Sequence, residues 1–119
     1  MARNNPAPPA IILRPAARRD FEAVFATISA QNPRRADDFL LAAQKALLQL
    51  GQLPHLGSPL DWTQIDQRLH SLRRWPIGGF RVYHLIYRPL ASGDGVVIFR
   101  VLHSAQDAPS RTIETLEDD

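Results

Sequence analysis

Short glycine-containing links between three strand-like runs limit the fold of this chain more than any other feature. Leu69–Trp75, Phe80–Arg88 and Val96–His103 are rich in β-branched and aromatic residues, as strands typically are. Only the segments PIGG and PLASGDG separate these runs. Because such short links join a strand to an antiparallel neighbour, we predict a three-stranded antiparallel meander.

The residues before these strands have the periodicity of two amphipathic helices. Apolar residues recur at helical spacing in Phe21–Ile28 and again in Ala36–Leu50. Asn32 and Pro33 separate the two sets, and these residue types are favoured at a helix N-cap and at the first helical position. Gly51 marks the end of the second set. Two helices joined this closely are expected to form an antiparallel hairpin.

The remaining segments complete an α+β chain. The apolar run Ala10–Leu13 predicts an N-terminal strand, and the proline-containing residues 1–9 predict a flexible leader. Residues 108–119 end in a cluster of acids, which predicts a short C-terminal helix or an acidic tail. We therefore expect one domain over residues 10–107. One sheet face should pack on the helical hairpin, and the other should remain open for binding.

Composition excludes several kinds of site. The chain of 119 residues has no cysteine, so disulfides and thiolate sites are impossible. Its four histidines are scattered without the spacing of a helical metal pair, and we expect neither a metal nor a cofactor. No run approaches membrane-spanning length, and the start lacks the apolar segment of a signal peptide. These features predict a cytoplasmic protein without membrane contact.

Arginine supplies nearly all the positive charge, because Lys45 is the only lysine. This bias favours bidentate contacts with carboxylate or phosphate, although GC-rich coding also replaces lysine by arginine. Several arginines and two tyrosines project from the predicted sheet. We expect them to form an anion-binding surface that meets the target: Arg73, Arg74, Arg81, Arg100, Tyr83 and Tyr87. In the alternative, Arg81 and Arg100 pair with acids such as Asp20 or those of the tail and hold elements together.

Alternation along the strands predicts which of these side chains share a face. In Phe80–Arg88 it places Arg81 on the same face as both tyrosines. In Val96–His103 it places Phe99 and Val101 together and Arg100 on the opposite face. The sheet is thus expected to present guanidiniums near aromatic rings.

Four segments carry a resemblance to a known family. They are ILRPAARRDFEAVFATI, NPRRADDFLLAAQKALLQLGQLPHLG, LRRWPIGGFRVYHLIYRP and VVIFRVLHSAQD. In their order and spacing they resemble the RelE/ParE superfamily of type II toxin-antitoxin toxins, and most closely its ParE branch. The resemblance covers Ile11 to about Asp107.

The resemblance implies a helical hairpin on a small antiparallel sheet, and a toxin that inhibits DNA gyrase, arrests growth and serves plasmid stabilisation. It also implies a toxin-antitoxin hetero-oligomer, in which a disordered antitoxin segment folds on binding. Hairpin residues are then expected in the core, some of them beside the antitoxin-binding groove: Phe21, Phe25, Phe39 and Leu47.

Two alternatives to the gyrase interpretation remain. RelE-like toxins cut messenger RNA on the ribosome, and here Arg74 and Arg81 would surround the phosphate. However, Ala105 and Gln106 stand where related toxins commonly carry arginines, and the tail has no tyrosine or histidine to donate a proton. The absence of an arginine at these two positions also fits a weakened toxin that only binds its antitoxin. We expect a binding protein rather than an enzyme.

Overall fold

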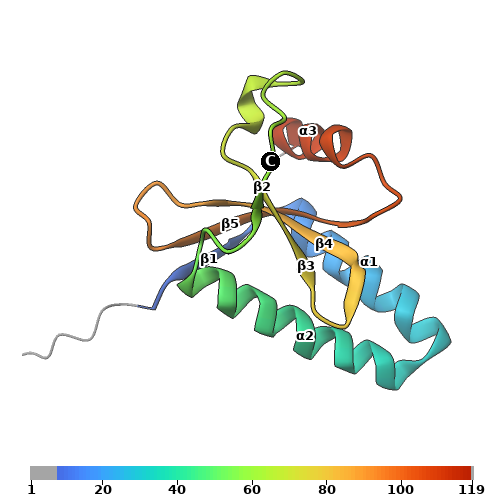
Figure 1. The fold of residues 1–119 in the computed structure, drawn as a ribbon. Helices are drawn as coiled ribbons and strands as arrows, with labels where there is room; N and C mark the ends of the chain where they lie inside the picture. Colours follow the sequence, from blue (N-terminus) through green and yellow to red (C-terminus); the bar gives the residue numbers. More distant parts are fainter. Residues whose placement is uncertain (1–7, 119) are drawn as a thin grey trace, which may run out of the picture.

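The elements follow the expected order of strand, helical hairpin and meander, and the chain ends in a further helix (Figure 1). The computed structural model describes residues 8–118, so most of the expected leader lies outside the described residues. The elements are β1 (Ala10–Leu13), α1 (Pro15–Gln31), α2 (Pro33–Gln52), β2 (Ser58–Pro59), a 3₁₀ turn (Gln67–Leu69), β3 (Arg73–Ile77), β4 (Phe80–Pro89), β5 (Gly95–His103) and α3 (Ala108–Asp118).

The sheet formed by the described residues has the strand order β1-β5-β4-β3-β2. The predicted meander is confirmed, because β4 pairs antiparallel with both β3 and β5. The N-terminal strand β1 pairs parallel with β5, which requires a long connection; α1, α2 and the strands β2 to β4 lie between them in the chain. β3 begins later than predicted because the 3₁₀ turn Gln67–Leu69 occupies the start of the expected run. Gly79 has a φ of 80°, which suits the tight turn from β3 to β4.

The helical hairpin covers one face of the sheet (Figure 1). The predicted boundary is confirmed, because the side chain of Asn32 accepts a hydrogen bond from the backbone N–H of Arg35 at 3.2 Å and Pro33 is the first residue of α2. Phe39 is fully buried at the centre of this core, where its ring contacts Phe80 and Tyr83.

The opposite face of the sheet was expected to remain open for binding. That expectation was wrong, because part of this face is covered. A second hydrophobic core lies there, formed by buried residues of the 3₁₀ turn, of the link from that turn to β3, and of β4 and β5: Leu69, Leu72, Ile86, Phe99 and Leu102. Ile113 and Leu116 of α3 pack against this core, together with Trp62 from the loop between β2 and the 3₁₀ turn. The C-terminal segment is thus an amphipathic helix that covers apolar sheet surface.

An irregularity in β5 changes which side chains share a face. The partners across the β4–β5 ladder shift from Ile86–Arg100 to Tyr87–Ile98, so one residue of β5 is extra. Phe99 consequently belongs to the second core and Val101 to the first. The predicted common face of Phe99 and Val101 was wrong because strict alternation does not survive a bulge.

Candidate functional site

Arg81 lies in a groove between α2 and the start of β4. The groove has a volume of about 300 Å³ and is lined on the helix side by Lys45 and Gln49, and on the strand side by Trp75. Arg81 is exposed, and no acidic partner for it occurs within residues 8–118. The strand pairing shifts between Pro76 and Ile77, opposite the first residues of β4. Arg81 therefore presents a positive charge beside an apolar wall.

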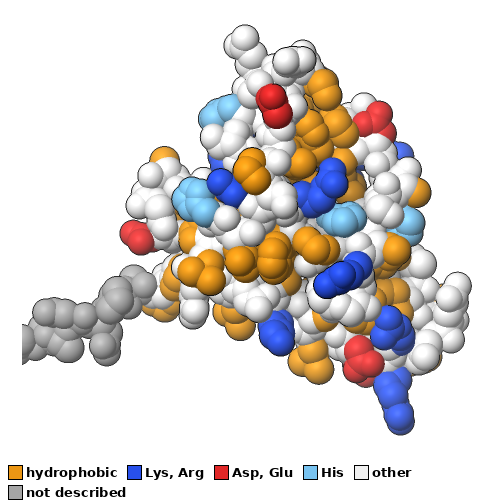
Figure 2. All heavy atoms as spheres, in the orientation of Figure 1, with side chains coloured by type: hydrophobic (Ala, Val, Ile, Leu, Met, Phe, Trp, Pro, Cys, Tyr) orange, Lys and Arg blue, Asp and Glu red, His pale blue; other side chains and the backbone are white. Residues whose placement is uncertain are grey.

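A stripe of exposed leucines on α2 continues this groove. Leu41 and Leu48 are 65% and 61% exposed, and they line a second hollow of about 340 Å³. Lys45 and Gln49 line both hollows, so the two adjoin. Figure 2 shows hydrophobic and cationic side chains interspersed over this part of the molecule. We call Leu41, Lys45, Leu48, Trp75 and Arg81 the α2 surface.

The hairpin residues expected beside an antitoxin groove lie mainly in the core. Phe39 is fully buried, and Phe21 and Leu47 are half-buried against the same core. Phe25 is half-buried on α1. The exposed residues that sequence reasoning missed are Leu41 and Leu48. Their spacing of two helical turns on the face of α2 away from Phe39 is a signal that could have found them.

Arg74 lies in a different pocket, near the start of α3. Arg74, His84 and His103 line this hollow of about 70 Å³, which shares no lining residue with the Arg81 groove. The backbone N–H of Ala105 donates to Nδ1 of His103 at 3.0 Å, so a neutral His103 carries its proton on Nε2. The rings of His103 and Tyr83 meet edge-on with centroids 5.4 Å apart. Arg74 and Arg81 therefore line separate pockets, whereas a single phosphate site would need the two arginines together.

His84 is the chemically distinctive residue of the Arg74 pocket. Its Nδ1 is buried, and no hydrogen-bond partner for it occurs among the described residues. Burial, and then the charges of Arg74 and His103, lower the pKa of His84 below its ordinary value. A neutral imidazole beside an exposed guanidinium can accept a proton, and this arrangement was not visible in the sequence.

Arg73 and Tyr87 hold the loop before β2. Nη1 of Arg73 donates to the carbonyl oxygens of Gly57 at 2.6 Å and His55 at 3.2 Å. The fully buried hydroxyl of Tyr87 donates to the carbonyl of Pro54 and accepts from the N–H of Gly57, both at 2.8 Å. Burial raises the pKa of Tyr87. Tyr87 therefore lies in the core, not on the surface where alternation had placed it for target contact.

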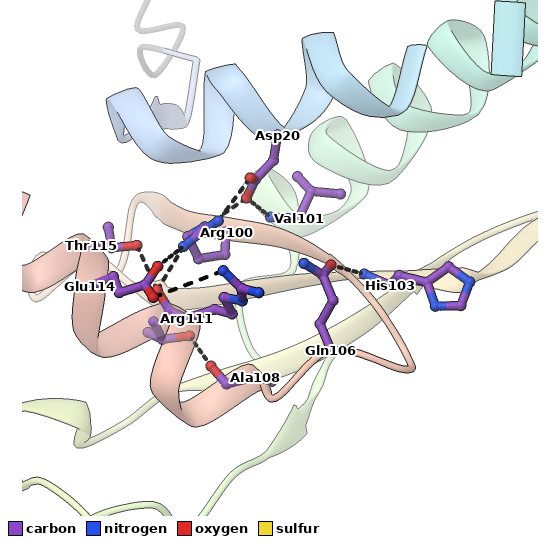
Figure 3. A network of polar contacts seen from close by, with 10 residues as sticks. Asp20, Arg100, Val101, His103, Gln106, Ala108, Arg111, Glu114 and Thr115 are labelled. Atoms are coloured by element: carbon purple, nitrogen blue, oxygen red, sulfur yellow. Dashed lines mark hydrogen bonds and ion pairs between the residues drawn. The ribbon is translucent and has the colours of Figure 1, made fainter. Parts of the chain in front are cut away.

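Arg100 joins α1, β5 and α3 (Figure 3). Its Nε and Nη2 donate to both carboxylate oxygens of Asp20, at 2.7 and 2.9 Å. Nη1 donates to the carbonyl oxygen of Arg111 at 2.7 Å and lies 3.8 Å from Glu114. The side chains of Arg100 and Asp20 are only 12% and 16% exposed. The sequence allowed Arg100 to pair with Asp20 as an alternative to target contact, and the structure contains this pair.

A comparison with protein families bears on this arrangement. The family model described as "ParE toxin of type II toxin-antitoxin system, parDE" matches residues 11–108, which include both helices of the hairpin, β2 to β5 and all of β1 except Ala10. The chain belongs to the ParE toxin family. A comparison with curated proteins found no match.

Membership in the ParE family confirms the predicted resemblance and implies a cognate antitoxin as the partner of this chain. Within residues 8–118 of this ParE toxin, no helix combines the length and hydrophobicity that crossing a membrane requires. The same residues contain no group of three or more histidines and acids placed to hold a metal ion.

Proposed function

We propose that this ParE toxin inhibits DNA gyrase, and that its antitoxin neutralises it by folding over the α2 surface. The observation that carries the proposal is the position of Arg81, an exposed cation without an acidic partner among residues 8–118, at one edge of a stripe of exposed leucines. Leu41 and Leu48 line one hollow on the same side of α2, and exposed apolar side chains grouped in this way are typical of an interaction surface.

The charges of the α2 surface define the antitoxin segment that fits it. An amphipathic helix could cover Leu41 and Leu48 with its apolar face. Acidic residues along its edge could pair with Lys45 and Arg81, which lie on either side of the groove. Such a segment would occlude Arg81, the residue that we assign to target contact. Neutralisation would then follow from direct masking.

The other predicted target residues divide into two groups. Arg74 is exposed and free to contact a target, whereas the half-buried Tyr83 packs between Phe39 of the first core and His103, which lines the Arg74 pocket. Arg73, Arg100 and Tyr87 make the internal hydrogen bonds described above, and we assign them to holding the fold.

Purified, antitoxin-free protein added to gyrase, plasmid DNA and ATP tests the proposal. We expect cleaved DNA to accumulate with the natural chain and with Arg18→Ala, which removes an exposed arginine of α1. Arg81→Ala should lose the effect while it retains its fold by circular dichroism. Absence of cleaved DNA with folded natural protein would contradict gyrase as the target.

The Arg74 pocket favours a second candidate function, ribosome-dependent cleavage of messenger RNA. Neutral His84 could act as a general base, and Arg74 could stabilise charge on a phosphate. The pocket supplies histidines that the C-terminal tail lacks. In this case ribosomes and messenger RNA should yield cleaved RNA with the natural chain but not with His84→Asn, whereas Arg81→Ala should retain activity.

A further inference from the structure

Arg35 connects the first turn of α2 to the turn between β3 and β4. Its backbone N–H donates to the side chain of Asn32 at 3.2 Å, so Arg35 lies within the capped start of the helix. Its Nη2 donates to the carbonyl oxygen of Gly79 at 3.1 Å, across 44 residues of chain. A single side chain therefore joins the hairpin of helices to the tip of the hairpin of strands.

The same guanidinium lies over the ring of Phe80, the first residue of β4. The guanidinium carbon of Arg35 is 4.2 Å from the ring centroid, a distance at which a cation is attracted to an aromatic face. Phe80 is 8% exposed, and its ring meets that of Phe39 edge-on with centroids 5.3 Å apart. Arg35 thus contacts the two residues that directly precede Arg81 in the chain.

The turn that Arg35 contacts has little else to hold it. Its two central residues, Gly78 and Gly79, have more backbone freedom than other residue types. A Cβ added at either position would meet no atom within 4 Å, so the turn is not packed against neighbouring side chains. Within residues 8–118, Arg35 makes the one side-chain hydrogen bond to this turn. The order of the turn therefore depends on Arg35.

The direction of Arg81 depends in turn on this short segment of backbone. Gly78 and Arg81 both line the groove of about 300 Å³ beside α2, whereas Arg35 does not line it. The Arg81 side chain makes no hydrogen bond or ion pair among the residues that the structure describes. With no side-chain contact to fix it, the guanidinium takes its place in the groove from the backbone at the start of β4.

We propose that Arg35 is a positioning residue, which holds the β3–β4 turn and so directs Arg81 into the groove. A binding group that is already ordered loses less conformational freedom when its partner binds. A planar guanidinium gains most from such order, because its paired hydrogen bonds need a defined orientation. The consequence for gyrase rests on the proposed function, whereas the contact of Arg35 with the turn does not.

Amide NMR relaxation on the full chain tests whether Arg35 orders the turn. In Arg35→Ala we expect increased motion at residues 78–81, and unchanged motion at Ala43, a buried position of α2. Arg34→Ala is the matched control, because it removes an exposed arginine of the same helical turn that makes no side-chain contact within residues 8–118. It should leave the β3–β4 turn as ordered as in the natural chain. Unchanged motion at residues 78–81 in folded Arg35→Ala would overturn the proposal.

A second arm connects the turn to Arg81. Binding to immobilised gyrase should weaken by at least about fivefold in Arg35→Ala and should stay unchanged in Arg34→Ala. In an Arg81→Lys background the Arg35→Ala change should weaken binding by less than about twofold, because a flexible ammonium depends less on the backbone than a planar guanidinium does. Equal losses in the two backgrounds would mean that Arg35 itself contacts gyrase, and they would overturn the proposal.

Failure of the proposed function would give a different result. If the natural chain does not bind gyrase, gyrase is not its target, and the relaxation measurement alone decides the role of Arg35. Increased motion confined to residues 78–81 of Arg35→Ala then supports Arg35 as the positioning residue for Arg81. Unchanged motion there overturns it.

Discussion

At the scale of single residues, Asp20 is the acid that makes a partly buried Arg100 tolerable. It accepts two hydrogen bonds from the guanidinium and a third, at 2.9 Å, from the backbone N–H of Val101. Asp20→Ala would remove the carboxylate that accepts both of these guanidinium hydrogen bonds, so we expect the free energy of unfolding to fall by about 3 kcal/mol. Urea denaturation measures this loss. Glu22→Ala, at an exposed position of α1, is the control and should change stability by less than about 0.5 kcal/mol.

A double-mutant cycle checks the origin of that loss. If the pair acts as a unit, Arg100→Ala combined with Asp20→Ala should destabilise by clearly less than the sum of the two single changes. Additive effects would contradict the assignment of Arg100 and Asp20 to one coupled contact.

His84 predicts how stability depends on pH at the same scale. Because its pKa in the folded protein is lower than in the unfolded chain, folding favours the neutral ring. The contribution of the neutral His84 ring to stability is fully present above the pKa that His84 has in the unfolded chain. It is lost as the pH falls through that value toward the lower pKa of His84 in the folded protein. We expect the natural chain to lose more stability than His84→Gln between about pH 7.5 and about pH 5. Parallel denaturation curves at the two pH values measure this difference, and identical losses would contradict it.

At the scale of elements, α3 is a helix whose position depends on its apolar face. Ile113 packs on the second core, and Thr112 and Thr115 are fully buried beside it. Ile113→Asp should detach α3 and lower stability by about 2 kcal/mol, because a carboxylate would face the apolar strands. Hydrogen exchange should then show faster exchange in α3 and continued protection in β4. Glu117→Ala, on the exposed face of α3, should leave both unchanged.

Local signals made the elements themselves predictable. Helical spacing, the Asn32-Pro33 boundary and short glycine links identify the hairpin and the meander. The bulge in β5 could not be predicted, because one extra residue moves Phe99 and Val101 to opposite faces without a composition signal. The parallel pairing of β1 with β5 joins segments far apart in sequence, so local periodicity carries no information about it.

The candidate site was predictable only as residue types. Sequence identified Arg74 and Arg81 as arginines of the sheet, and both are exposed. It offered the contact between Arg100 and Asp20 only as an alternative, and it gave no sign that Tyr87 bonds to the loop before β2, because those partners become neighbours only in the folded chain. The exposed leucines of α2, by contrast, had a helical spacing that was available from the start.

At the scale of the whole molecule, the proposed function predicts that toxicity and neutralisation can be separated. Leu41→Asp with Leu48→Asp changes exposed side chains only, so the fold and the gyrase effect should persist. Antitoxin affinity should fall at least tenfold, because charge replaces the apolar stripe. Arg81→Ala should instead abolish cleavage by gyrase while most antitoxin affinity remains. Calorimetry with the antitoxin and the gyrase gel assay measure the two properties on the same preparations.

The outcome of this experiment depends on how the two contacts share the α2 surface. Lys45 and Gln49 line both hollows, so an antitoxin segment seated on the leucines extends toward Arg81. If the leucine variant stays folded and also loses its effect on gyrase, gyrase and the antitoxin contact the same residues. The two partners then compete directly for the α2 surface. If it remains toxic and resists the antitoxin, the leucines serve the antitoxin alone, and Arg81 is where binding of one partner excludes the other.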